Sequence, residues 1–227
     1  MNRQAGFTLF ELLLAISISS VLILAVSNFA TSGISGSNQD YNKTLVLTNA
    51  KEAVNVVARQ IRAARSVQAS NSLPDLHAPG APADLYSWSG TSGSNATLIL
   101  AVPSRDAAGN VIYIDGLHTA VYTDDVIFYL DDSTRRLFRR RIANPSAPGN
   151  AAITTCPPSA ATPSCPSDAN VVDDVASLST AYLGSNNSPV AIPSGTEAVQ
   201  YTVTETRTIN NRQFTGTYSS VATLRNK

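Results

Sequence analysis

The chain begins with a short polar segment followed by Gly6-Phe7-Thr8-Leu9-Phe10-Glu11, which opens an apolar run that continues to Ala30. The 24 residues from Phe7 to Ala30 include a single charged side chain, that of Glu11. A helix of this length spans roughly 36 Å at ~1.5 Å per residue, enough to cross a ~30 Å hydrocarbon layer with some tilt. The run therefore predicts a membrane-spanning helix at the start of the chain.

Three interpretations of this helix compete: a cleaved secretory signal, a permanent anchor, and a segment that inserts and is later withdrawn. The length of the run and the single Arg3 before it weaken the signal-peptide interpretation, although Ala25-Val26-Ser27 loosely resembles a small-residue cleavage site. Glu11 needs an explanation in each case, because a carboxylate at mid-bilayer costs about 2.5–3.5 kcal/mol. Either it has a functional partner, or it lies near the interface and stays hydrated.

The residues around Glu11 resemble the class III signal of type IV prepilins and type II secretion pseudopilins. The shared features are the short leader 1–6 ending in Gly6, then Phe7, the acid and the uninterrupted apolar run. The resemblance implies that prepilin peptidase cuts between Gly6 and Phe7 on the cytoplasmic side and methylates Phe7. It also implies that Glu11 pairs with the Phe7 ammonium of a neighbouring subunit during assembly, and the spacing of four residues allows a pair within one chain as the alternative.

Beyond the apolar run the pattern predicts an amphipathic helix and then strands. Gly33 and Gly36 are expected to bend or partly unwind the helix, and a stripe of small and β-branched residues from Ala50 to Ala64 is expected to pack on a sheet. Prolines and glycines between 70 and 95 predict a loop. The β-type segments are 96–102, 111–114, 125–130, 137–142, 171–183, 198–208 and 214–224.

These elements predict an α+β, pilin-like fold, with a long N-terminal helix packed on an antiparallel sheet. The expected organisation is a leader at 1–6, a transmembrane and assembly helix at 7–30, and an exported domain at 31–227. Within that domain we expect the amphipathic helix at 31–68 and a mainly β region at 96–227, which includes a Pro-rich loop at 144–168.

Composition restricts the possible partners. The chain has sixteen basic and sixteen acidic residues, and removal of the leader with Arg3 leaves it nearly neutral. A chain without an excess of basic residues has no positive electrostatic potential that would support general nucleic-acid binding. We therefore predict no specific nucleic-acid partner.

Cys156 and Cys165 lie close together in the Pro-rich loop. In an exported chain such a pair predicts a disulfide, which would contribute roughly 2–3 kcal/mol in the chain-entropy model. The alternatives are a metal site, for which neither His77 nor His118 is near in sequence, and two free thiols.

The sequence offers little for catalysis, and we predict neither an enzyme nor a cofactor. It has two histidines and no Gly-rich phosphate loop, and a triad of His118, Asp115 and a serine can be drawn in any serine-rich chain.

Calcium binding by the paired acids at 124–125 and 131–132 lacks an identifiable loop motif, so we predict no metal. Five arginines within 135–141 are interpreted as a solvated strand face balanced by those acids, in preference to an anionic-surface patch.

The order of the downstream segments also resembles the W-type minor pilins and the J-type minor pseudopilins. The matching pieces are the helix end at 58–64, the hairpin from Phe128 to Arg140, the segment 175–183 and the C-terminal 221–226. The resemblance implies a minor pilin that prepilin peptidase processes and that assembles with other major and minor pilins into a type IV pilus or its tip complex. The alternatives are a J-like minor pseudopilin of a type II secretion system and a tip binding module for adhesion or DNA uptake. Before assembly such a subunit would span the inner membrane once, with its C-terminal domain in the periplasm or outside the cell.

Overall fold

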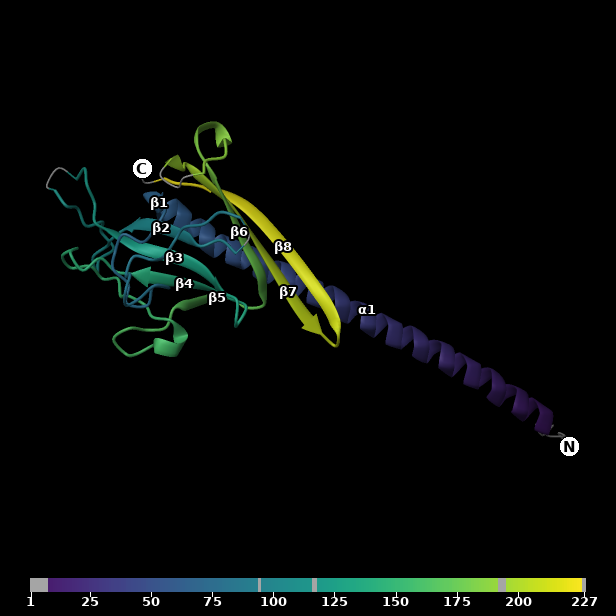
Figure 1. Cartoon of the computed structure of the whole chain (residues 1–227). Helices are drawn as coiled ribbons and strands as arrows, with labels where there is room; N and C mark the ends of the chain where they lie inside the picture. Colours follow the sequence, from purple (N-terminus) through teal and green to yellow (C-terminus); the bar gives the residue numbers. More distant parts are fainter. Residues whose placement is uncertain (1–7, 94, 116–117, 192–194, 226–227) are drawn as a thin grey trace. The chain divides into compact units, whose positions relative to one another are not determined.

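Helix α1, Leu9–Ala63, is the longest element of the structure, which is a computed structural model (Figure 1). The structure describes residues 8–93, 95–115, 118–191 and 195–225. The chain divides into two units, Met1–Thr44 and Leu45–Lys227, so that α1 contributes to both. Each unit is described by itself.

The described part of the first unit is helical apart from Thr8. Helix α1 continues through Gly33 and Gly36, so the unwinding expected at these glycines does not occur in this structure. Glycine costs only about 1 kcal/mol relative to alanine in a helix, and α1 accommodates two such positions without a break. The large apolar side chains of this unit are exposed in the chain taken alone.

The second unit contains two antiparallel sheets. The five-stranded sheet has the order β1-β2-β3-β4-β5 and the three-stranded sheet the order β6-β7-β8, as Figure 1 shows. The strands of the first are Ser66–Gln68, Leu98–Pro103, Thr123–Asp131, Arg136–Ile142 and Ala169–Val172, and those of the second are Val175–Leu183, Ala198–Ile209 and Arg212–Thr223. Two short 3₁₀ helices, Pro158–Ala160 and Ser185–Asn187, lie in the loops. The structure thus confirms the α+β fold and divides the predicted β region between two sheets.

The predicted apolar stripe of α1 packs into the main core. Ala50, Val54, Val57 and Ile61 are at most 1% exposed, and the core cluster that includes the last three also holds side chains from both sheets. The helix ends at Ala63 and does not reach residue 68. Just beyond the helix, the Arg65 N–H donates to the Ala101 carbonyl at 2.8 Å instead of to a carbonyl of α1. This bond turns the chain into β1.

The five-stranded sheet is covered on both faces. Alternate residues of β2, such as Leu98 and Leu100, belong to the main core, whereas Ile99 joins a second cluster with Trp88 and Ile127 on the opposite face. Because side chains alternate along a strand, a sheet buried on both faces explains why every residue of β2 is buried. The covering layer on the second face includes the predicted loop at 70–95, which holds Trp88.

Two predicted β segments differ from the structure. Residues 111–114 form only isolated bridges, Arg105 with Val111 and Tyr113 with Val121. The segment 171–183 is interrupted between β5 and β6, where Asp174 has a φ of 58°. Such a left-handed residue breaks an extended strand, and the break carries the chain from one sheet to the other.

Candidate functional site

Helix α1 begins with a reciprocal pair of hydrogen bonds between Thr8 and Glu11. The Glu11 N–H donates to Thr8 Oγ1 at 3.2 Å, and the Thr8 N–H donates to Glu11 Oε2 at 2.9 Å. The Thr8 hydroxyl also donates to Glu11 Oε2, at 2.9 Å. This arrangement is a capping box, which satisfies backbone N–H groups that the first turn of a helix leaves unpaired.

The capping box gives Glu11 a local structural role that we did not predict. The sequence contains the signature of a capping box, the pattern Thr8-x-x-Glu11 ahead of an apolar run. A capping role and a role as counter-charge for a Phe7 ammonium are compatible, because a carboxylate has acceptor sites beyond those that Thr8 uses. Gly6 and Phe7, the predicted cleavage and methylation residues, lie outside the described residues.

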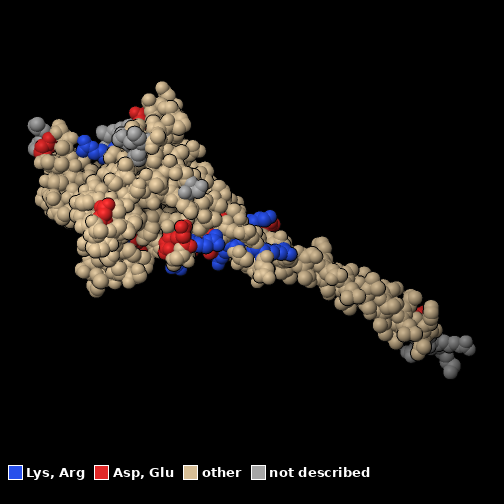
Figure 2. All heavy atoms as spheres, viewed as in Figure 1, with Lys and Arg blue, Asp and Glu red and all other residues tan. Residues whose placement is uncertain are grey.

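The surface that follows Glu11 is apolar and uncovered. Helix α1 is long and apolar enough, by length and composition, to cross a membrane, and the most apolar 18-residue stretch of it has no buried residue within the chain. In Figure 2 the first part of the helix is almost entirely free of basic and acidic side chains. Apolar surface of this extent indicates contact with lipid or with another protein.

The start of the chain matches a motif known from a protein family. Residues 1–27 match the prokaryotic N-terminal methylation motif. The match supports a type IV pilin-like protein, in agreement with the resemblance seen in the sequence, and it covers the capping box and most of the apolar run. No curated protein matches the chain.

The predicted disulfide is present between Cys156 and Cys165, with the two Cα atoms 5.5 Å apart. Cys156 is buried, and its backbone is held from both sides: its N–H donates to the Pro166 carbonyl at 2.9 Å, and its carbonyl accepts from the Asp168 N–H at 2.7 Å. The disulfide therefore fastens the Pro-rich loop next to Asp168.

Strand β4 corrects our interpretation of a solvated face at Arg140, whereas Arg136 on the same strand is exposed. Arg140 is fully buried between Asp75 and Asp168. Its Nη2 donates to Asp75 Oδ1 at 2.7 Å, its Nε lies 2.7 Å from Asp75 Oδ2, and its Nη1 donates to Asp168 Oδ2 at 3.1 Å. The predicted partner acids at 124–125 and 131–132 are not the ones that pair with it. Arg140 shares a strand face with the apolar Phe138 and Ile142, and this alternation was the signal that it is buried.

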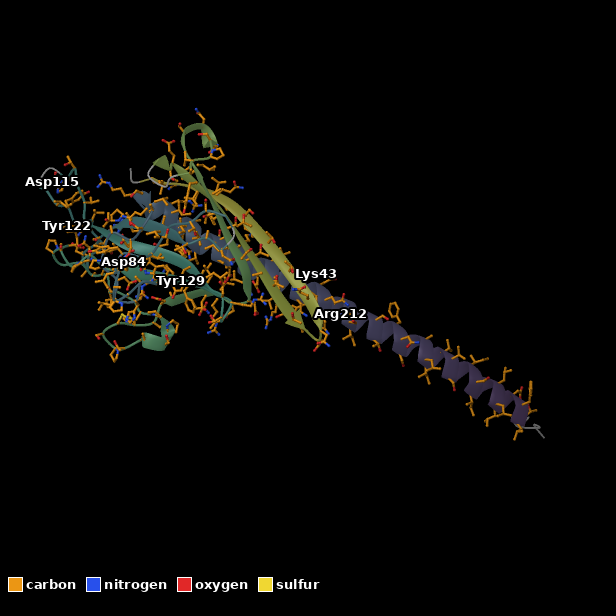
Figure 3. All side chains as sticks on the ribbon, in the orientation of Figure 1. Lys43, Asp84, Asp115, Tyr122, Tyr129 and Arg212 are labelled. Atoms are coloured by element: carbon orange, nitrogen blue, oxygen red, sulfur yellow. A yellow bond between two sulfur atoms is a disulfide. The ribbon has the colours of Figure 1, made fainter. Side chains whose placement is uncertain are left out.

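Two aromatic side chains complete this cluster, the buried Trp88 and the partly buried Tyr129. Trp88 Nε1 donates to Asp75 Oδ2 at 2.7 Å, and the Tyr129 hydroxyl donates to Asp168 Oδ2 at 2.8 Å. Burial, followed by the charge of Asp168, raises the pKa of Tyr129 well above its ordinary value, so it remains a donor. Figure 3 shows Tyr129 among the crowded side chains of the sheet. The cluster joins the loop at 70–95 and the disulfide loop to β3 and β4, which is a structural role.

The acids considered for calcium hold loops instead. Asp125 accepts from the N–H of Ser72 at 2.6 Å and that of Leu73 at 2.9 Å, and burial raises its pKa. Asp124 accepts from the Ser104 hydroxyl at 2.7 Å. Among the residues that the structure describes, no group of three or more His, Cys, Asp or Glu side chains is placed to hold a metal ion.

The triad that can be drawn on paper is not assembled around His118. The Asp115 carboxylate accepts hydrogen bonds from the Thr119 hydroxyl and from the Thr119 N–H. The His118 ring lies against Tyr113, with ring centroids 4.3 Å apart. The start of α1, which the methylation motif covers, is thus the best candidate site.

Proposed function

We propose that this chain is a minor pilin subunit. Prepilin peptidase removes residues 1–6 and methylates Phe7, and the subunit then assembles through α1 into a type IV pilus or its tip complex. The observation that carries the proposal is the methylation motif at residues 1–27, which leads directly into an uncovered apolar helix.

Two further features support an exported subunit. The disulfide is typical of an oxidising compartment such as the periplasm. The exposed apolar face of α1 can be covered first by the inner membrane and then by the helices of neighbouring pilins, so one surface serves both states. In this proposal the partners are prepilin peptidase, the inner membrane, and other major and minor pilins.

Processing tests the proposal directly. In a host with active prepilin peptidase, intact mass of the purified protein should correspond to a chain that starts at Phe7 with one added methyl group. Gly6→Leu should leave the full-length precursor in the membrane, because a large side chain replaces the small residue before the cut. Gly33→Ala is the matched control and should be processed normally, since a Cβ there meets nothing within 4 Å. A chain that starts at Asn28 would identify a secretory signal instead, and an intact Met1 in that host would contradict processing.

A further inference from the structure

A basic pocket lies just beyond the ends of α1, β2 and β8. Its volume is about 350 Å³. Arginines from three separate parts of the chain line it: Arg65 follows α1, Arg105 follows β2, and Arg225 follows β8. Among the described residues that line the pocket, none is an aspartate or a glutamate. We call it the arginine pocket.

The charges of these three arginines are not neutralised within the part of the chain that the structure describes. The ion pairs found there belong to Arg136, Arg140 and Arg207 on other strands. Nη1 of Arg105 donates to the Gly109 carbonyl at 2.6 Å, which leaves the other N–H groups of that guanidinium available. Three like charges around one pocket favour a negatively charged occupant.

The acids nearest to the pocket in sequence hold their own loops. Asp106 accepts from the N–H groups of Ala108 and Asn110, at 2.9 and 2.8 Å. Asp115 accepts from the hydroxyl and the N–H of Thr119. These bonds lower the pKa of both carboxyl groups, with Asn110 and Thr119 as the main donors. The two acids are thus engaged by loop groups and do not pair with the arginines.

The rest of the wall suits an organic group. Isolated bridges join Arg105 to Val111 and Tyr113 to Val121, and so hold this part of the segment between β2 and β3 together. The exposed rings of Tyr113 and His118 lie with their centroids 4.3 Å apart and both line the pocket. The volume lies within the roughly 300–1,000 Å³ of small-molecule sites, so the pocket has room for more than a bare anion.

The basic groups favour a phosphate over a carboxylate. The planar fork of N–H donors on arginine matches the oxygens of either group. A phosphate monoester carries about −1.5 to −2 charges at neutral pH and presents several strong acceptor oxygens, so it can engage guanidinium groups from different sides. A carboxylate offers less charge and fewer oxygens.

We propose that the arginine pocket binds a small organic phosphate. Arg65, Arg105 and Arg225 hold the phosphate group, and the organic part packs against Tyr113 and the apolar wall. All lining residues belong to the second unit. The inference therefore goes beyond the proposed function and does not depend on assembly.

Titration with phenyl phosphate tests the pocket. We would add it to the full chain in uncharged detergent micelles and follow backbone amide resonances by NMR. The comparison probes are phenol, benzoate, and NaCl at matched ionic strength. Phenyl phosphate should shift the amides at 105–113 and 118–121, benzoate should bind more weakly, and phenol and NaCl should leave these amides unchanged.

Arginine variants test which groups hold the phosphate. Arg225→Gln and Arg65→Gln should each weaken binding roughly tenfold or more, the effect of losing about 1.4 kcal/mol. Neither side chain makes a hydrogen bond or an ion pair within the described part of the chain, so the fold should persist in both. The matched control is Arg212→Gln at the opposite end of β8, where the side chain is exposed (Figure 3), and it should bind as the unmodified chain does.

Four results would overturn the inference. They are an absence of shifts with phenyl phosphate, equal shifts with phenol or NaCl, benzoate binding as tight as that of phenyl phosphate, and unchanged binding in both Arg225→Gln and Arg65→Gln. A response to a single-stranded DNA oligonucleotide without a response to phenyl phosphate would also overturn it, because the arginines would then follow a polymer backbone and not enclose a small ligand.

Discussion

Arg140 is fully buried, and its burial is tolerated because two carboxylates surround its guanidinium. Removing one member of a buried ionic group leaves the others charged and unpaired, which is more costly than the pairing itself is favourable. The two acids also hold two long loops, so the consequences of losing Arg140 extend beyond β4.

Replacing Arg140 should therefore destabilise the domain strongly. We expect Arg140→Met to lower the free energy of unfolding by about 3–5 kcal/mol, measured by urea unfolding of the full chain in detergent micelles. Arg136→Met is the matched control on the same strand. Its ion pair with Asp173 is half exposed, so its loss should cost less than about 1 kcal/mol. Similar effects of the two substitutions would contradict the role assigned to the buried cluster.

Glu205 makes stability depend on pH. Its pKa is raised from 4.5 to about 7 in the folded chain, mainly by burial. The hydrogen bond from Asn49 and the charge of Arg207 oppose this shift, and the charges of Asp174 and Asp173 add to it. Between these two values the folded chain keeps a proton that the unfolded chain releases, so the free energy of unfolding falls as pH rises through this window. The loss is at most about 3.5 kcal/mol, at ~1.4 kcal/mol per pKa unit.

We expect Glu205→Gln to remove most of this loss, because the amide does not titrate. The measurement is the free energy of unfolding at pH 5 and pH 8 for the unmodified chain, Glu205→Gln and the exposed control Asp132→Asn. A difference between the two pH values that is the same for all three proteins would rule out Glu205 as its source.

At the scale of elements, the contact between β8 and α1 depends on Gly216. A Cβ at this position would lie 2.9 Å from Val46 Cγ1 and 3.0 Å from the Leu47 backbone nitrogen. The strand approaches the helix so closely that there is room only for a hydrogen. Helix α1 is regular here, so its backbone cannot move aside without losing its own hydrogen bonds.

Gly216→Ala should therefore be destabilising, although alanine is the smallest side chain available. We expect a loss of about 1–3 kcal/mol, the range for overpacking a filled core, and a larger loss for Gly216→Val. Gln213→Ala, at an exposed position of the same strand, serves as the control and should change stability by less than about 0.5 kcal/mol. Thermal unfolding followed by circular dichroism would measure all three, and an unchanged melting temperature in Gly216→Ala would contradict the close approach.

At the scale of the whole molecule, the two units have different requirements. Residues from Leu45 onward bury most of their apolar side chains in their own core, whereas the first unit leaves its large apolar side chains exposed within the chain. The second unit is stabilised from within, and the first requires a membrane or other subunits. This difference is what the proposed function demands of a subunit that moves from a bilayer into a fibre.

Assembly should depend on the charge of Glu11, separately from its capping role. Glu11→Gln keeps an acceptor for the Thr8 N–H but removes the charge, Glu11→Ala removes both, and Thr8→Val removes the hydroxyl cap but keeps the charge. If Glu11 pairs with a Phe7 ammonium, Glu11→Gln and Glu11→Ala should both lower the ratio of subunit in sheared fibres to subunit in membranes. Thr8→Val should leave this ratio nearly unchanged, since losing a cap costs only about 1 kcal/mol.

Membrane residence should persist in all three variants, because removing a carboxylate from an apolar helix makes insertion easier. A ratio that falls in Thr8→Val and Glu11→Ala but not in Glu11→Gln would assign Glu11 to capping alone. A ratio unchanged in every variant would leave Glu11 as a hydrated interfacial acid.

The features that could be predicted from the sequence are local or periodic. The apolar run, the stripe from Ala50 to Ala64 and the alternating segments predict α1 and most strands, because helix and strand each impose a repeat on neighbouring residues. The same kind of signal, read more closely, would have shown the Thr8 and Glu11 capping box and the inward face of Arg140.

Which distant groups meet depends on how the elements pack against one another. The partners of Arg140 are Asp75, 65 residues away, and Asp168, 28 residues away, although Asp131 and Asp132 are nearer in sequence. Glu205 is buried because β7 packs beside Asn49 of α1. A buried charge is stabilised by whatever the fold places within about 3 Å of it, and for residues far apart in the chain the sequence pattern does not predict that distance.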